Sequence, residues 1–370
     1  MVDKKNIFLL LLIVFGFLGG QRVSTALESK ANVPDKIEVR RYTSFYTQSG
    51  HGYNLKEFNR ADNNPILNAC LTGATYKELK ELGVDNLLTR LEKLQKGKIV
   101  KKVNDYYYLA FPTIVGKKRA KLQKLVEQTA LQLLPTSENM IEQILPHLER
   151  NEMLYHVLWS VVMDGSIAWN TVKNELQERI KKGNTSIKNT AWLIYPRHPY
   201  TCGTNSYGGS DSQIIGVIIT WNSNSPEPSK THRNISKYEK ELIQSYAQER
   251  PVEGAEARET LALYGLLNEK GIAKAHIVDV NSEAAQTYKT LASHFAHQFM
   301  TLCDIEKVAN LLDATPGQAL LIAYHEVCYE ILKQLVTKGT LKIPEKAEKN
   351  QMHRLITFVT AIKELDIKKK

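Results

Sequence analysis

A leucine-spaced segment that ends in a glycine is the feature that most narrows the possible folds of this chain. Leucines recur at positions 87, 88, 91 and 94, the spacing that places apolar side chains on one face of an α-helix. Gly97 follows the repeat, and glycine often ends a helix because it reaches backbone conformations closed to other residues. The pattern predicts a helix over about residues 85–95 that stops at Gly97.

The residues after this helix have the pattern of a β-hairpin. "KIVKKV" and "YYYLAFP" are rich in β-branched and aromatic residues, and only Asn104 and Asp105 separate them. Two such runs joined by a two-residue turn are typical of antiparallel strands. We therefore expect two paired strands between Gly97 and Pro112.

Two shorter helical runs, "ILNACL" and "TYKELKELG", precede the leucine-spaced segment. Three helices followed by a hairpin form an order that resembles the winged helix-turn-helix family over about residues 65–116. The resemblance implies that the third helix enters a nucleic-acid groove with Arg90 and Lys93. It further implies that the wing and the residues after it contact phosphate or another anion through Lys98, Lys101, Lys102, Lys117, Lys118 and Arg119.

The charge distribution agrees with a basic binding face. The chain carries a net charge of +10, and residues 77–124 contain thirteen Lys or Arg against five acids. A concentrated basic region attracts polyanions such as nucleic acid, anionic lipid or wall polymer. The competing interpretation is that these charges only keep a helical surface solvated.

The N-terminus predicts export or membrane anchoring. Lys4 and Lys5 precede an apolar run over residues 7–20, and small residues at Ser24 and Ala26 supply a cleavage pattern after residue 26. The run is shorter than the roughly 20 residues that cross a bilayer as a helix. We expect a secreted or extracytoplasmic protein, with an uncleaved anchor at residues 7–20 as the alternative.

The whole chain is expected to be an α+β protein, mainly helical and built of several lobes. Residues 27–64 are polar and predict an arm or linker, residues 117–225 predict helices with a strand-loop-strand, and residues 226–370 predict a helical domain. "TVKNELQERIKKGNTSIKNTAWLIYP" repeats the helix, Lys-Gly and strand order of the first module. One winged-helix-like module is therefore expected, or two in tandem with the second at residues 150–221.

Two sets of residues suggest chemistry. His294 and His297 on one predicted helix could meet His325, Glu326 and Glu330 on another to hold a metal, although "HEVCYE" lacks the second histidine of a zinc-protease helix. Cys202 shares a polar loop with His198, Asn205 and Asp211, which are residue types used in thiol catalysis. No helix signal follows Cys202 to activate it, so an ordinary surface loop is the competing interpretation.

These observations favour a non-enzymatic binding protein without a cofactor. Its basic winged-helix-like face would hold a protein or an anionic polymer, because an exported chain does not meet chromosomal DNA. Two alternatives remain: a membrane-tethered DNA-binding regulator, if the body lies in the cytosol, and a metal-dependent hydrolase with its site in the C-terminal helices. Four well-separated cysteines without a C-x-x-C pair exclude zinc-ribbon and thioredoxin-type sites.

Overall fold

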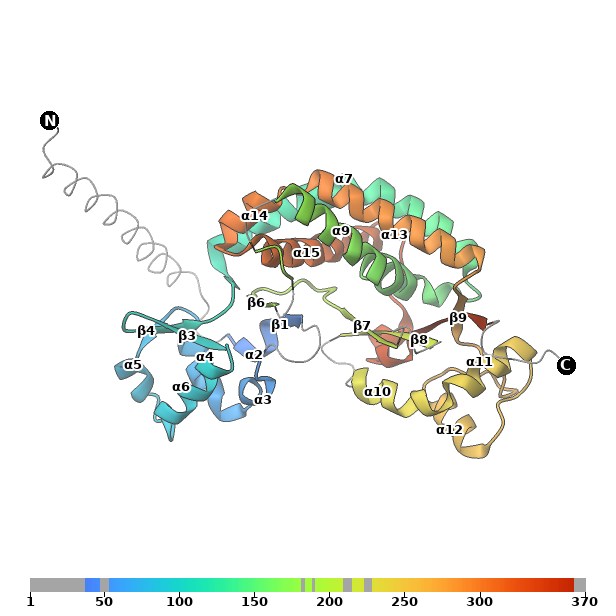
Figure 1. The fold of residues 1–370 in the computed structure, drawn as a ribbon, viewed down its shortest axis with the longest axis horizontal. Helices are drawn as coiled ribbons and strands as arrows, with labels where there is room; N and C mark the ends of the chain where they lie inside the picture. Colours follow the sequence, from blue (N-terminus) through green and yellow to red (C-terminus); the bar gives the residue numbers. More distant parts are fainter. Residues whose placement is uncertain are drawn as a thin grey trace, which may run out of the picture. The chain divides into compact units, whose positions relative to one another are not determined.

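The computed structural model describes residues 37–46, 53–180, 184–187, 190–208, 215–222 and 228–362. The fold is α+β and mainly helical, as the sequence predicts. Two compact units are present (Figure 1): unit 1 comprises the chain up to Leu125 with Gly183–Arg197 and Ile305–Ala323, and unit 2 comprises Val126–Lys182, His198–Asp304 and the chain from Tyr324. The predicted signal or anchor at residues 1–26 lies outside the described residues.

Unit 1 combines short helices with two three-stranded sheets. Its first helices are α2 (Val39–Tyr42), α3 (Leu55–Phe58), η1 (Ala61–Asn63), α4 (Asn64–Ala69), α5 (Tyr76–Lys80) and α6 (Leu87–Lys96). Its strands are β1 (Thr43–Tyr46), β2 (Ala74–Thr75), β3 (Val100–Val103), β4 (Tyr106–Leu109), β5 (Thr113–Ile114) and β6 (Thr190–Ile194). The first part of α7 (Gly116–Ile144), α14 (Ile305–Leu312) and the start of α15 (Pro316–Thr337) complete it.

The predicted hairpin is confirmed. β3 pairs antiparallel with β4, with Val103 opposite Tyr106 across the two-residue turn. Asn104 takes the left-handed conformation with φ 55°, which asparagine tolerates better than most residues. Helix α6 ends before Gly97 as predicted, but the left-handed residue there is Lys98, with φ 58°.

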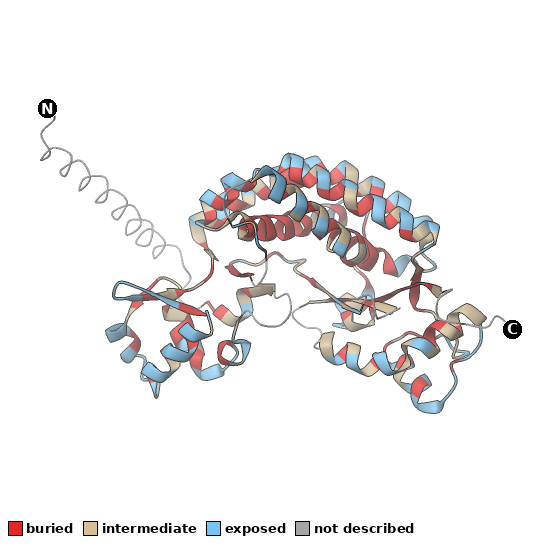
Figure 2. Cartoon of the chain, in the orientation of Figure 1, coloured by how far each residue is buried: buried red, intermediate tan, exposed pale blue. Residues whose placement is uncertain are grey.

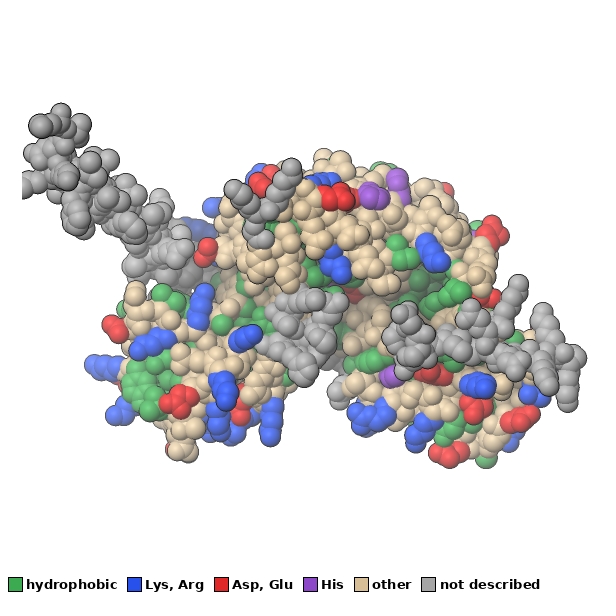
Figure 3. Space-filling view, viewed as in Figure 1, with side chains coloured by type: hydrophobic (Ala, Val, Ile, Leu, Met, Phe, Trp, Pro, Cys, Tyr) green, Lys and Arg blue, Asp and Glu red, His purple; other side chains and the backbone are tan. Residues whose placement is uncertain are grey.

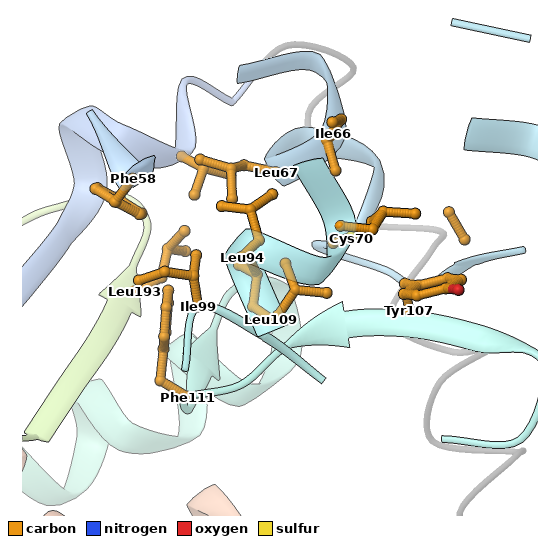
Figure 4. Packing of buried hydrophobic residues seen from close by; sticks show 14 of the residues in the cluster. Phe58, Ile66, Leu67, Cys70, Leu94, Ile99, Tyr107, Leu109, Phe111 and Leu193 are labelled. Carbon is orange, nitrogen blue, oxygen red and sulfur yellow. The ribbon is translucent and has the colours of Figure 1, made fainter. Parts of the chain in front are cut away.

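The core of unit 1 joins segments that are distant in the sequence. Phe58, Leu94, Phe111 and Leu193 come from four different segments and are all buried in one cluster (Figure 4). β6 supplies Leu193 because it pairs antiparallel with β1 and parallel with β5, giving the strand order β1-β6-β5. Apolar area removed from water contributes about 25 cal/mol per Å², so this shared cluster stabilises the noncontiguous segments together.

Part of the predicted polar arm is folded. In the range 27–64, residues 37–46 and 53–64 contribute α2, β1, α3 and η1, and they bury Ile37, Val39 and Phe58 in the core. The Val39 backbone N–H also donates to Asn68 Oδ1 at 3.2 Å. A few apolar residues at the right positions therefore fix a segment whose overall composition is that of a linker.

Unit 2 is built on a four-stranded sheet of order β7-β8-β10-β9. Its strands are β7 (Gly203–Gly208), β8 (Ile215–Trp221), β9 (His276–Asp279) and β10 (Ile356–Thr360). Figure 1 shows long helices on one face of the sheet and α10–α12 on the other. Beside the later parts of α7 and α15, the helices are η2 (Leu145–His147), η3 (Asn151–Met153), α8 (Leu154–His156), the π-helix η4 (Val157–Met163), α9 (Ser166–Arg179), α10 (Pro228–Ile235), η5 (Ser236–Tyr238), α11 (Glu239–Gln248), α12 (Ala255–Leu263), α13 (Glu283–Leu302), α16 (Glu345–Glu348) and η6 (Met352–Arg354).

Two segments depart from the structure that their residues favour. Proline disfavours the interior of a helix, but α7 continues through Pro135 to Ile144. Pro135 has no N–H to donate to the Leu131 carbonyl, and an interior proline destabilises a helix by about 3 kcal/mol. Both residues are exposed, so water can bond to that carbonyl instead. Residues 226–370 are predicted to form a helical domain, but this range also contributes β9, and its mostly β-branched residues 356–360 form β10 between β8 and β9.

The described residues do not form the hairpin expected for a second winged-helix-like module at residues 150–221. Residues 184–187 contain no strand, and β6 belongs to the sheet of unit 1, whereas β7 and β8 pair with each other in unit 2. The Lys-Gly and aromatic-strand likeness is therefore local. Repeated sequence order did not produce repeated strand pairing, because pairing depends on partners outside the segment.

Candidate functional site

Five of the eight predicted anion contacts are exposed lysines of unit 1. Lys93 lies on α6, Lys98 precedes β3, Lys101 and Lys102 lie on β3, and Lys117 lies in the first turn of α7. Among ion pairs between described residues, none involves these five ammonium groups. Figure 3 shows Lys and Arg side chains on the surface of the lobe that carries α4–α6. These lysines can meet an anionic partner without first breaking an ion pair within this part of the chain.

Arg90 has a structural role. Its guanidinium donates to Asp62 Oδ2 at 2.6 Å, to Asn63 Oδ1 at 3.0 Å and to the Asp85 carbonyl at 2.8 Å. Hydrogen bonds from Arg60 and Arg90 hold the pKa of Asp62 well below its usual range. Arg90 therefore fastens α6 to η1, and its donors are occupied by the protein itself.

Lys118 and Arg119 are also drawn inward. Arg119 is buried and donates through Nε to the Pro196 carbonyl at 3.2 Å. Burial lowers the pKa of Lys118, and the charge of Asp313 partly offsets this effect. The structure thus divides the predicted set into five surface lysines and three residues held within unit 1.

The outer face of the β3–β4 hairpin carries residues that the sequence prediction did not select. Tyr106 is 43% exposed and Val103 is 47% exposed, whereas Tyr107, the next residue of β4, is buried. Alternation along a strand sends neighbouring side chains to opposite faces, so the run of three tyrosines contains one core residue and two on the outer face. The letters "YYYL" are alike in polarity, so the sequence alone does not tell which tyrosines lie on this surface; the burial pattern along β4 does.

The predicted metal ligands do not converge. On α13, His297 contacts Glu175 and His294 lies 3.1 Å from Gln298. His325, Glu326 and Glu330 are buried in α15. No group of three or more His, Cys, Asp or Glu side chains in the described part of the chain is arranged to hold a metal ion.

Unit 2 contains a buried polar cluster beside the π-helix η4. His156 Nδ1 lies 2.5 Å from Thr220 Oγ1, and its Nε2 lies 2.7 Å from Thr357 Oγ1, so both ring nitrogens have partners on the sheet. Ser160 contacts Thr220 and accepts a hydrogen bond from Thr204 at 2.9 Å. Burial lowers the pKa of His156 to about 3, and the imidazole is therefore neutral and joins the end of α8 to β8 and β10.

Asp164 follows η4 and is also buried. Its Oδ1 accepts a hydrogen bond from Trp169 Nε1 at 2.8 Å and lies 3.7 Å from His325 Nε2. Burial raises the pKa of Asp164, while His325 acts in the opposite direction. The His325 ring lies between aromatic neighbours, with centroids 6.1 Å from Trp159 and 5.3 Å from Trp169. This surrounding excludes water from the His325–Asp164 pair and favours a role in packing over one in catalysis.

The second histidine–carboxylate pair joins His198 to Glu330. Burial would raise the pKa of Glu330, but hydrogen bonds from His198, Lys333 and Gln334 hold it at about 2. Cys202 is buried, and burial raises its pKa far above the usual range. A thiol catalyst needs an accessible thiolate, so these residues do not form the predicted thiol site; Asp211 lies outside the described residues.

Among the described residues, no helix combines the length and apolar character that a membrane span requires. Comparison with protein-family models finds no match to this chain, and comparisons with curated proteins and with solved structures likewise find none. The residues that bear on function are therefore the exposed lysines of unit 1 and the buried histidine clusters of unit 2.

Proposed function

We propose that this protein is a non-enzymatic, exported or membrane-tethered binding protein that holds an anionic partner through Lys93, Lys98, Lys101, Lys102 and Lys117. The proposal rests on one observation: these five lysines are exposed and make no ion pair with another described residue. A lysine ammonium that is solvated and unpaired gains Coulomb energy from an approaching anion without losing an intramolecular partner. The α4-β2-α5-α6-β3-β4 order supports a winged-helix-like module as the carrier of this face.

The buried clusters of unit 2 support a binding role over hydrolysis. Their histidines and carboxylates are hydrogen bonded to each other or to threonines, and the described residues offer no metal-ligand group. The DNA-binding alternative uses the same lysines, but Arg90 is held by Asp62 and Asn63. An acidic protein or polymer needs only the positive potential of the lysines, so it is the partner class we favour.

The test measures binding of labelled poly-L-glutamate and of labelled duplex DNA over a range of salt concentrations. Replacing Lys98, Lys101 and Lys102 together by alanine should weaken binding and lower the salt slope on DNA by about one unit per lysine. The matched control is Lys56→Ala, an exposed lysine of α3 outside the proposed face. An unchanged slope in the triple variant would refute the proposal, and strong preference for duplex DNA would favour the DNA-binding alternative.

A further inference from the structure

The outer face of the β3–β4 hairpin combines apolar and basic side chains. We define this hairpin face as Lys101, Val103, Tyr106 and Tyr108. In the antiparallel register, Val103 lies opposite Tyr106 and Lys101 lies opposite Tyr108. Directly paired residues of an antiparallel sheet project from the same face, so the four side chains form one continuous surface.

The hairpin face is rigidly supported from beneath. Tyr107 and Leu109, which alternate with the exposed Tyr106 and the half-buried Tyr108, are buried in the core of unit 1. Tyr108 packs on Gly73, where an added Cβ would lie 2.3 Å from Tyr108 Cε1. The ring centroids of Tyr106 and Tyr108 lie 6.3 Å apart. The face therefore exposes its side chains on a fixed backbone.

The apolar residues are concentrated at the tip of the hairpin. Val103 and Tyr106 immediately flank the Asn104–Asp105 turn and are each nearly half exposed. Figure 2 shows the end of the hairpin as exposed where it extends from the helices of its lobe. Lys101 lies on the same face as Val103 and Tyr106, and Lys102 lies beside Val103 on the opposite face, with its ammonium 5.6 Å from the centroid of the Tyr107 ring. The turn itself carries one acid, Asp105. An exposed apolar tip with two lysines beside it matches the two components of an anionic bilayer surface.

We propose that the hairpin face docks on the surface of a membrane rich in anionic lipid, with Val103 and Tyr106 entering the interfacial layer and the lysines contacting headgroups. This inference rests on the proposed function, because it uses the same exposed lysines and adds a lipid surface to the anionic partners that they can hold. Tyrosine favours the membrane interface, where its ring is apolar and its hydroxyl remains hydrated. Lysines near an anionic leaflet add electrostatic attraction.

Other anionic partners would contact fewer of the side chains on the hairpin face. A nucleic acid gains from the lysines and from stacking on tyrosine, but it does not require an exposed valine at the tip. The other exposed large apolar side chains among the described residues of unit 1 are Leu55, Tyr76, Leu82 and Leu88. Leu55 and Tyr76 are each followed two residues later by a glutamate, Glu57 and Glu78. Leu82 and Leu88 have acids close in sequence, Glu81, Asp85 and Glu92, and these residues disfavour an anionic surface there. The hairpin tip is thus the part of unit 1 best matched to a bilayer.

The experiment compares sedimentation of the full protein with vesicles of phosphatidylglycerol and phosphatidylcholine, and with vesicles of phosphatidylcholine alone. We expect binding to the anionic vesicles only. Val103→Ser with Tyr106→Ser should lower vesicle affinity at least about tenfold while binding of poly-L-glutamate is retained. Lys101→Ala with Lys102→Ala should lower both, by about fivefold per lysine on vesicles.

The controls separate this inference from the proposed function. Leu88→Ser replaces an apolar residue on α6 that is more exposed than Val103 or Tyr106, and it should leave vesicle binding unchanged. If the Val103/Tyr106 variant binds vesicles as the natural sequence does, or if the protein binds poly-L-glutamate or DNA but no vesicles, membrane docking is wrong and the proposed function stands. If the lysine variant binds every probe unchanged, both proposals are wrong. Circular dichroism of each variant checks that the fold is kept.

Discussion

The two units differ in how they place ionisable side chains. All nine histidines among the described residues belong to unit 2, and four of them are buried: His156, His198, His276 and His325. The described residues of unit 1 contain no histidine, and their ionisable surface is dominated by exposed lysines. Lysine keeps its charge at physiological pH, whereas histidine changes charge near neutrality. We therefore expect salt to change anion binding through the lysines of unit 1, and acid to change the stability of unit 2 through its histidines.

The largest expected effect is acid destabilisation of unit 2. Burial lowers the pKa of His156 to about 3 and that of His276 to about 4. A histidine with a lowered pKa in the folded state binds fewer protons than it does in the unfolded chain, so stability is lost as the pH falls below about 6.5. Together the two residues should reduce the free energy of unfolding by an amount on the order of 5 kcal/mol by pH 4.

Hydrogen exchange followed residue by residue can test this effect in each unit. The amide of Val280, bonded to the Thr360 carbonyl in unit 2, should lose protection on acidification more than the amide of Leu109, bonded to the Cys70 carbonyl in unit 1. His156→Gln should flatten the pH dependence, and His294→Gln, on the exposed side of α13, is the control. Equal losses in both units would contradict the comparison.

The second effect concerns the core of unit 1. Leu94→Ala should destabilise unit 1 by about 3 kcal/mol, because deletion of a fully buried leucine side chain leaves a cavity. Leu88→Ala on the same helix, where the leucine is 57% exposed, should change stability by less than about 0.5 kcal/mol. Denaturant unfolding with exchange at the Leu109 and Val280 amides measures both. If Val280 loses as much protection as Leu109, the units unfold as one and the comparison needs revision.

The smallest expected effect distinguishes two basic residues of α6. Arg90→Ala removes the hydrogen bonds to Asp62 and Asn63 and should lower the melting temperature without changing the salt dependence of anion binding. Lys93→Ala should keep the melting temperature and lower the salt slope by about one unit. Thermal unfolding and salt titrations on both variants provide the measurement. A reversal of the two outcomes would show that Arg90, and not Lys93, belongs to the binding face.

Local sequence patterns predicted the elements whose determinants lie within a few residues. The α6 helix follows from leucine spacing, and the β3–β4 hairpin follows from its Asn-Asp turn. Distant partners were not predictable in this way. β6 has the composition of a strand, but its neighbouring residues do not indicate that Leu193 pairs with Thr43. The same limit explains β10, which is a strand because β8 and β9 flank it.

The candidate site was predicted in part for the same reason. The basic region could be predicted from the sequence, because the charge of a lysine does not depend on its neighbours. Tertiary contacts decide which of these cations stay free on the surface. Arg90 is hydrogen bonded to Asp62 and Asn63, and Arg119 is bonded to the Pro196 carbonyl. The pairing of Val103 with Tyr106 depends on register, so the exposed apolar tip became visible only with the strands in place.

The pairing of β6 with β1 also has a consequence for biosynthesis. Thr43 and its partner Leu193 are 150 residues apart in the chain. At about 5 to 20 residues per second of translation, β1 must wait roughly 8 to 30 s for β6 to be made. During this interval the apolar residues of the early segments lack the Leu193 side chain that packs with them. A chaperone present at this stage would therefore have its largest effect on the first half of the nascent chain.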